Sequence, residues 1–187
     1  MDLTALLDES IASTGKIVAG VRPDQLDDST PCSEWDVRAV LNHVIGVATV
    51  FSHVGEGKPI DRPDPTTDYF DGEAYAAAYD SATAAMLAAW RKPGMLDARI
   101  TLPFGDVPGS VGASINFIDV LVHGWDLARA TGQDARLDPD LAQPALELSR
   151  GIMNDQLRQS GAFGPEVPVA ADAPAGDRLV AFLGRTP

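Results

Sequence analysis

The chain has 187 residues and a formal charge of −13, from 27 acidic and 14 basic side chains, with one cysteine and three histidines. A chain of this length buries a core of its own and needs no disulfide or metal to fold. The few scattered basic residues argue against a nucleic-acid partner, because binding through phosphates requires a basic face. No run approaches the roughly 18 apolar residues of a membrane span, so we expect no membrane partner.

The N-terminus and the cysteine count bear on the compartment. Asp2 stands where a signal peptide would carry cations, which argues against secretion. Cys32 is the only cysteine and cannot form an intrachain disulfide, which fits a reducing cytoplasm. The same counts exclude a cysteine-rich zinc site, so any transition-metal site must combine at most three histidines with carboxylates.

The first half of the chain predicts long helices. Apolar residues at helical spacing indicate a first helix over residues 3–21. A second helix is expected to begin with Ser33 as its N-cap and to run to about His53. Residues 55–71 are rich in proline, glycine and aspartate and suit a long crossover along a bundle. An alanine-rich third helix follows over residues 72–92.

The second half begins with a short alternating segment over residues 98–107, which predicts a small β-hairpin. A fourth helix is expected over residues 111–131, closed by Gly132, and a fifth from Pro139 to about Gln159, with Asp138 as N-cap. An extended segment over 163–168 and a short helix over 177–183 complete the chain.

These elements predict an all-α fold: a four-helix bundle with a long crossover between its second and third helices, a small β-hairpin insertion and short C-terminal helices. We expect one domain over residues 1–187, with the bundle over about 1–132 and a helical extension over about 138–187.

The predicted fourth helix carries polar residues on one flank. Asp119 and His123 are four residues apart, and Asp126 follows three residues later, in a segment that is otherwise nearly all apolar. Burying a carboxylate and an imidazole is costly unless they are paired or coordinated. The spacing fits two ligands of one metal ion, and it equally fits a local hydrogen bond at a helix boundary.

The other histidines differ in position. His43 lies on the flank of the apolar stripe of the predicted second helix, between helices, so it could join Asp119 and His123 from a facing helix. This favours the metal interpretation. His53 lies opposite that stripe, where we expect solvent exposure.

Other chemistries have less support. Cys32 stands near a helix start, where a thiol can be activated, but no histidine is close in sequence and the position also suits a packed thiol. No glycine-rich nucleotide motif is present. Trp35 and Trp125 could shape a pocket, although large aromatic residues in bundles usually belong to the core.

Two segments resemble a known family. Residues 30–38 (TPCSEWDVR) leading to His43, and residues 122–132 (VHGWDLARATG), resemble the mycothiol-dependent maleylpyruvate isomerase-like proteins of the DinB superfamily. Phe163-Gly164-Pro165, followed by residues 177–184 (DRLVAFLG), is similar to a single-domain branch of that group. The resemblance thus covers nearly the whole chain.

The resemblance implies a four-helix bundle that holds a divalent metal, commonly zinc or nickel. His43 and His123 match the two histidine ligands, and Asp119 occupies the acidic position, where the family more often has glutamate. Because aspartate is one methylene shorter, Asp119 could bind the ion directly or act through water. Asp126 matches the motif and could orient a ligand imidazole.

The functional hypothesis is a cytoplasmic, metal-dependent enzyme in which a small thiol, mycothiol by resemblance, attacks a small electrophilic substrate. It would act as a thiol transferase or as a maleylpyruvate isomerase-like enzyme, with no catalytic residue separate from the metal ligands and with unknown thiol-binding residues. Zinc is the first choice of metal and nickel the second. Characterised isomerases of the family carry a further C-terminal domain, whereas 55 residues follow Gly132 here, so isomerisation is not inherited.

Two alternatives remain open. The first is a non-catalytic metal-binding bundle with a structural or sensing role. The second is a metal-free structural or dimerisation module, in which the polar flank serves hydrogen bonding alone. A homodimer is compatible with the alanine-rich third helix, whose face could be shared between two copies.

Overall fold

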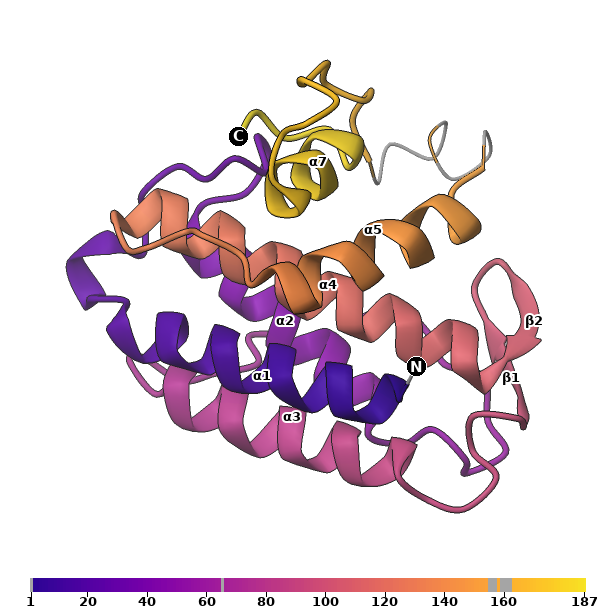
Figure 1. The fold of residues 1–187 in the computed structure, drawn as a ribbon. Coiled ribbons are helices and arrows are strands. Elements are labelled where there is room, and N and C mark those ends of the chain that lie inside the picture. The colour runs from indigo at the N-terminus through magenta and orange to yellow at the C-terminus, as the bar shows by residue number, and fades with distance from the viewer. Residues whose placement is uncertain (1, 65, 155–157, 159–162) are drawn as a thin grey trace. The chain divides into compact units, whose positions relative to one another are not determined.

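Four long helices form the first part of the chain: α1 Leu3–Gly20, α2 Val37–Phe51, α3 Tyr75–Trp90 and α4 Gly109–Thr131 (Figure 1). A short 3-10 helix, η1 Pro23–Gln25, lies between α1 and α2. The computed structural model describes residues 2–64, 66–154, 158 and 163–187. The chain folds as two compact units, Met1–Gln133 and Asp134–Pro187.

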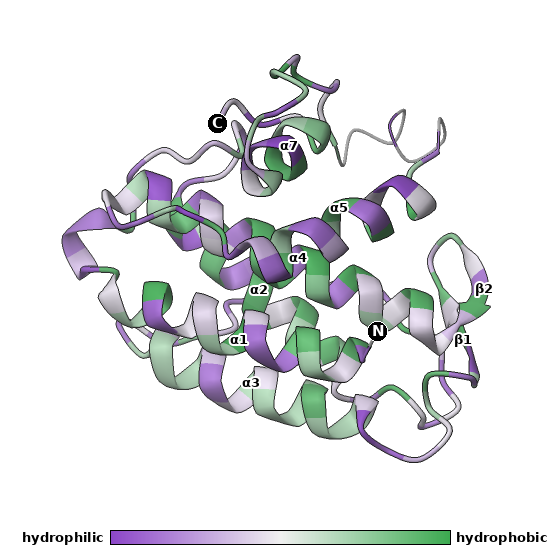
Figure 2. Cartoon of the chain, viewed as in Figure 1, coloured by the Kyte–Doolittle hydropathy of each residue, from purple (hydrophilic) through white to green (hydrophobic). Residues whose placement is uncertain are grey.

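The four helices pack as a bundle. α1 lies against α3 and α4, and α2 lies against the same two helices, so each helix has two neighbours. α4 is buried along most of its length, and the α3 ribbon is largely hydrophobic (Figure 2). The predicted all-α bundle is confirmed.

The helix ends follow local capping rules, with one correction. The side chain of Asp2 accepts hydrogen bonds from the backbone N–H groups of Thr4 and Ala5, and Gly132 ends α4 with a φ of +70°, which glycine adopts without strain. The predicted N-cap at Ser33 is wrong. Asp36 caps α2 by accepting a hydrogen bond from the N–H of Ala39 at 2.8 Å.

The displaced start of α2 has a physical cause. Residues 29–36 form a turn closed by a β-bridge between Ser29 and Asp36, and the Trp35 N–H donates to the Cys32 carbonyl at 2.8 Å. These bonds use backbone groups that a helix beginning at Ser33 would need. The helix therefore begins at Val37, one turn later than predicted.

The crossover between α2 and α3 packs on α2. The Tyr69 N–H donates to Asn42 Oδ1 at 2.7 Å, and Asn42 Nδ2 donates to the Thr67 carbonyl at 2.8 Å. A Cβ added at Gly46 would come within 2.9 Å of the side chains of Pro63 and Tyr69. Glycine at position 46 therefore permits the close approach of the crossover to α2.

The predicted β-hairpin is present, with β1 Arg99–Leu102 antiparallel to β2 Gly105–Pro108. Leu102 pairs with Gly105, so Pro103 and Phe104 form the two-residue turn. The hairpin is hydrogen-bonded to the crossover: the Ile60 N–H donates to the Thr101 carbonyl of β1 at 2.8 Å.

The second unit contains α5 Pro139–Ile152 and α7 Ala175–Phe182, which pack together. Asp138 caps α5, as predicted, by accepting a hydrogen bond from the Asp140 N–H at 2.9 Å. The predicted helix end is wrong, because α5 ends at Ile152; Gln159 itself lies outside the described residues.

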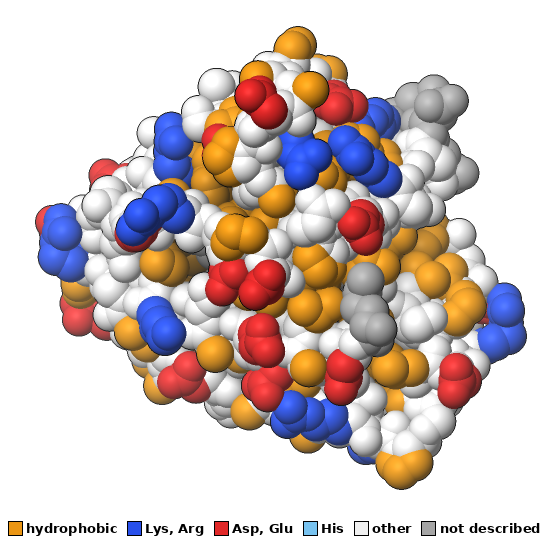
Figure 3. All heavy atoms as spheres, in the orientation of Figure 1, with side chains coloured by type: hydrophobic (Ala, Val, Ile, Leu, Met, Phe, Trp, Pro, Cys, Tyr) orange, Lys and Arg blue, Asp and Glu red, His pale blue; other side chains and the backbone are white. Residues whose placement is uncertain are grey.

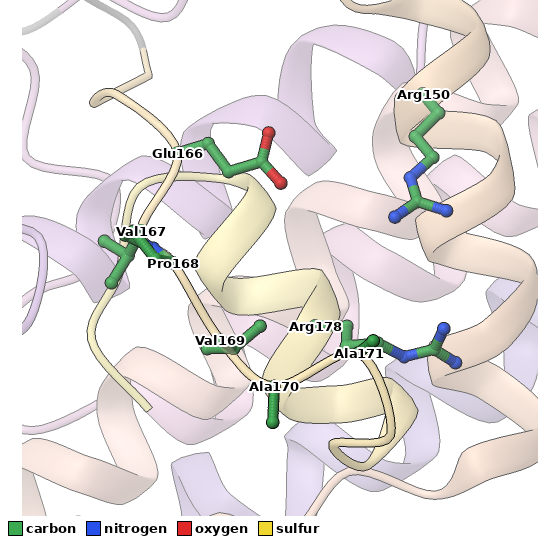
Figure 4. A pocket seen from close by; sticks show the side chains of 8 residues that line it. All are labelled: Arg150, Glu166, Val167, Pro168, Val169, Ala170, Ala171 and Arg178. Carbon is green, nitrogen blue, oxygen red and sulfur yellow. The ribbon is translucent and has the colours of Figure 1, made fainter.

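A pocket of about 510 Å³ opens within this second unit (Figure 4). Arg150 and Arg178 approach it from α5 and α7, and the Glu166 carboxylate lies across from them, with the segment 167–171 as an apolar wall. The charged part of this lining is thus two guanidinium groups and one carboxylate.

The surface carries both charge types. On the face drawn in Figure 3, acidic side chains are interspersed with basic ones and do not form one large area of a single sign. Among the helices that the structure describes, none has the length and apolar character needed to cross a membrane.

Candidate metal centre

Three predicted ligands from two helices meet inside the bundle. Asp119 Oδ1 on α4 lies 3.1 Å from His43 Nε2 on α2 and 3.5 Å from His123 Nε2, one turn further along α4. One ligand atom from each of the three residues lies within 4.8 Å of the other two. The structure therefore brings together the residues that the sequence singled out.

The fourth predicted residue, Asp126, lies behind His123. His123 Nδ1 and Asp126 Oδ2 are 2.9 Å apart, and the Asp126 side chain is fully buried. Because a carboxylate can only accept, the ring donates through Nδ1, and Nε2 keeps its lone pair. Asp126 thereby fixes the tautomer in which His123 Nε2 can bind a metal ion.

These distances fit a divalent ion. Ligand atoms at 2.0–2.1 Å from a tetrahedral ion lie about 3.3 Å from one another, and the two short distances in the cluster are 3.1 and 3.5 Å. Two imidazole nitrogens and one carboxylate oxygen suit zinc and nickel. The three ligand atoms lie within 4.8 Å of one another, so His43, Asp119 and His123 could hold such an ion.

The site is only partly open to solvent. The side chains of His43, Asp119 and His123 are 25%, 18% and 9% exposed. An ion held there would be reached from the His43 side of the cluster more readily than from the His123 side. Such restricted access excludes bulk water, which strengthens electrostatic interactions within the site.

Trp35 covers the histidines, a contact that the sequence did not predict. Its indole centroid lies 4.6 Å from that of His43 and 5.7 Å from that of His123, and the two imidazoles are 5.0 Å apart. Sequence reasoning offered Trp35 either as a pocket residue or as a core residue. In the structure it is half-buried. No helical periodicity could reveal the contact, because Trp35 precedes α2.

The pKa of Tyr79, on α3, responds to its burial and to the negative charge of Asp119. Burial raises the pKa of its hydroxyl well above the ordinary value, and the negative charges of Asp80 and Asp119 act in the same direction. The hydroxyl donates to the Ile11 carbonyl at 3.0 Å. Tyr79 is therefore a buried, uncharged side chain of the bundle near Asp119.

The remaining candidates lie apart from this cluster. His53 is 61% exposed and lies 2.9 Å from Glu56, which confirms its predicted exposure. Cys32 is half-buried in the turn that leads to Trp35. Trp125 is buried on α4, with the guanidinium of Arg129 5.3 Å from its ring.

The bundle and the cluster together define a class: a helical bundle in which two facing helices bring candidate metal ligands together. Residues 7–128 match the family model described as the mycothiol maleylpyruvate isomerase N-terminal domain. The chain belongs to this family, and the matched range contains His43, Asp119, His123 and Asp126.

Two curated proteins of Mycobacterium tuberculosis, named Uncharacterized protein MT0763 and Uncharacterized protein Rv0738, are each 39% identical over 173 residues. The alignment covers 91% of this chain and 90% of each relative. These relatives therefore match the second unit as well as the bundle.

Two solved structures share the fold. The crystal structure of the mycothiol-dependent maleylpyruvate isomerase superposes with a TM-score of 0.60 at 13% identity, covering 78% of this chain and 66% of that one. A histidine-to-alanine mutant of the isomerase gives a TM-score of 0.54 at 16% identity, with 67% and 59% covered. The chain thus spans about two thirds or less of these isomerases.

Proposed function

We propose that this protein is a divalent-metal enzyme that uses a small thiol of the mycothiol type. It would either join the thiol through its sulfur to a small electrophile or isomerise that electrophile. The observation that carries the proposal is the convergence of His43, Asp119 and His123, whose ligand atoms lie within 4.8 Å of one another. The family supports the choice of thiol, since its model is named for mycothiol maleylpyruvate isomerase.

Each side chain has a distinct role in this proposal. His43 and His123 offer Nε2 atoms, and Asp119 offers a carboxylate oxygen whose single charge leaves a divalent ion with a net positive charge. Asp126 accepts the Nδ1 proton of His123 and keeps that ring in its metal-binding tautomer. We propose zinc as the ion, with nickel second, because this mixed nitrogen and oxygen set suits both.

The chemistry follows from the charge of the site. A divalent ion held there supplies a Lewis acid that favours the thiolate over the thiol form of a small ligand at neutral pH. The partly buried side chains of His43 and Asp119 limit access of water to the site. Such thiol chemistry belongs in a reducing cytoplasm, where we place the protein.

The first test is metal content. Protein purified without a metal-affinity step is expected to contain, or to take up, about one equivalent of zinc or nickel, as measured by elemental analysis. His123→Ala should remove this ion, and His53→Ala, which deletes an exposed histidine outside the cluster, should not. Less than a tenth of an equivalent after zinc addition would refute the metal site.

The second test is turnover. We expect the zinc-loaded protein to accelerate consumption of maleylpyruvate or chlorodinitrobenzene only when mycothiol is present, and His123→Ala to abolish that acceleration. A protein that binds zinc but leaves the reaction with mycothiol no faster than the same reaction without protein would be a non-catalytic metal-binding bundle.

A further inference from the structure

We propose that Trp35 is a positioning residue of this centre: its indole holds the imidazoles of His43 and His123 in the orientation that turns both Nε2 atoms toward Asp119. The inference rests on the proposed metal site and adds to it a residue outside the ligand set.

The geometry joins three rings from three segments. The indole is tilted by 43° to the imidazole of His43 and by 31° to that of His123, and the two imidazoles meet edge to face at 70°. Aromatic rings with centroids 4.5–7 Å apart in tilted arrangements attract one another. The three rings therefore restrict one another's rotation.

His43 depends on this contact more than His123 does. His123 is fixed through Nδ1 by Asp126. For His43, the described residues supply no hydrogen bond at Nδ1, and its hydrogen-bond contact is the one between Nε2 and Asp119. Rotation of an imidazole about its χ2 bond is soft unless packing restrains it. The indole at 4.6 Å restrains the His43 ring in addition to its contacts with Asp119 and His123.

The turn that presents Trp35 is itself well held. The hydroxyl of Thr30 lies 2.7 Å from the Trp35 carbonyl oxygen and accepts a hydrogen bond from the Cys32 N–H at 3.1 Å. On the other side of Trp35, Asp36 caps α2 and the Val37 N–H donates to the Asp28 carbonyl at 3.0 Å. Both flanks of Trp35 are thus fixed by hydrogen bonds.

Exposure separates Trp35 from the other tryptophans. Trp90 and Trp125 are 1% and 5% exposed and belong to the core, whereas Trp35 is half-buried. A half-buried indole that faces two proposed ligands contributes less to the core than it does to the site. Truncating Trp35 should therefore disturb the metal centre more than the fold.

Zinc affinity measured by competition with a chelator tests the proposal. Trp35→Ala should weaken zinc binding about 10- to 100-fold, as loss of a supporting contact usually does, and Trp35→Phe should stay within a few-fold of wild type because a ring remains. Trp125→Phe, two residues beyond His123, is the matched control and should bind as wild type. Circular dichroism and the melting temperature establish that each variant is folded.

The outcomes are distinguishable. If wild-type protein binds no zinc, the proposed function fails, whatever Trp35 does. If wild type binds zinc and Trp35→Ala binds it equally well with a lower melting temperature, Trp35 has only a structural role and the inference is wrong.

A double-mutant cycle tests the turn. Thr30→Val removes the hydroxyl that lies against the Trp35 carbonyl, and we expect it to weaken zinc binding several-fold in the wild-type background and not at all in Trp35→Ala. Equal losses in both backgrounds would overturn the assignment of Thr30 as the residue that holds Trp35.

Discussion

His123 Nδ1 lies 2.9 Å from Asp126 Oδ2, while Nε2 of the same ring faces Asp119 Oδ1 at 3.5 Å. One imidazole thus lies between two carboxylates of its own helix, at positions i−4 and i+3. The buried carboxylate accepts a hydrogen bond from the ring Nδ1–H, and the half-buried one faces the side on which a metal ion would bind.

Asp126→Ala is expected to weaken zinc binding about 10- to 100-fold, because His123 loses the acceptor that fixes its tautomer. Asp126→Asn should lose less, since its amide oxygen still accepts the Nδ1 proton. Chelator competition measures both, with Asp97→Asn, an exposed carboxylate of the α3–β1 loop, as control. An affinity of Asp126→Ala equal to wild type would contradict this role.

His43→Ala is expected to lower zinc stoichiometry from about one to near zero, because it removes the ligand from α2 and leaves two on α4. His53→Ala removes the same type of side chain from an exposed position and should bind one equivalent. Isothermal titration with zinc separates the two results. Equal stoichiometry in both variants would exclude His43 from the site.

Gly124→Ala is expected to lower the free energy of unfolding by about 1–3 kcal/mol, the usual cost of overpacking. An added Cβ at position 124 would overlap the side chain of Thr14, whose hydroxyl donates to the Val120 carbonyl at 3.0 Å. Urea unfolding measures the effect. Gly15→Ala, whose Cβ would make an ordinary 3.4 Å contact with Tyr79, is the control and should cost little.

The overlap between a Cβ at position 124 and Thr14 also predicts that substitutions at these two positions are energetically coupled. Thr14→Ala removes the hydroxyl oxygen and Cγ2 that the new Cβ would meet and leaves only the Thr14 Cβ, at 3.1 Å, so the loss in Gly124→Ala combined with Thr14→Ala should be smaller than the sum of the two single losses. Additive losses would show that some other contact limits position 124.

Alkaline pH should destabilise the bundle through Tyr79. Its folded-state pKa is raised by burial, so above pH 10 the unfolded chain releases a proton that the folded chain retains. Stability is therefore full below pH 10 and falls above it, by up to about 1.4 kcal/mol per pH unit for this group. Tyr79→Phe should flatten that fall, at a cost of about 1 kcal/mol near neutral pH from the lost hydrogen bond.

Denaturant unfolding at pH 8, 10 and 11 measures this effect. Tyr75, whose pKa burial also raises, remains in Tyr79→Phe and contributes its own share of the slope. Tyr69→Phe keeps both groups and should follow wild type. An unchanged slope in Tyr79→Phe would show that the buried phenol does not govern alkaline stability.

The sequence was sufficient to predict the cluster of candidate ligands because helical spacing is rigid. Asp119, His123 and Asp126 share one flank of any helix that contains them, and His43 lies at the edge of an apolar stripe, so their meeting required only that α2 and α4 pack together. The hairpin and the crossover could also be predicted from local sequence. Alternating residues indicated the hairpin, and the proline and glycine content indicated the crossover.

Non-helical segments were harder to predict. The start of α2 depends on a turn whose backbone hydrogen bonds join Val37 to Asp28 and Trp35 to Cys32, and the position of Trp35 depends on that turn. The predicted end of the fifth helix was also wrong. The apolar pattern of the sequence continues past Ile152, where α5 ends. Such features depend on tertiary and loop contacts that periodicity does not encode.

His43 and Asp119 are 76 residues apart in the chain, and this separation links metal binding to folding. In the proposed site, Asp119 and His123 lie one turn apart on α4, whereas His43 is brought to them by the packing of α2 against α4. An ion that binds the complete set therefore binds the native chain selectively. At a free concentration 100 times its Kd it would add about 2.7 kcal/mol to native stability, so the supply of metal would also shift the balance between folded and unfolded protein.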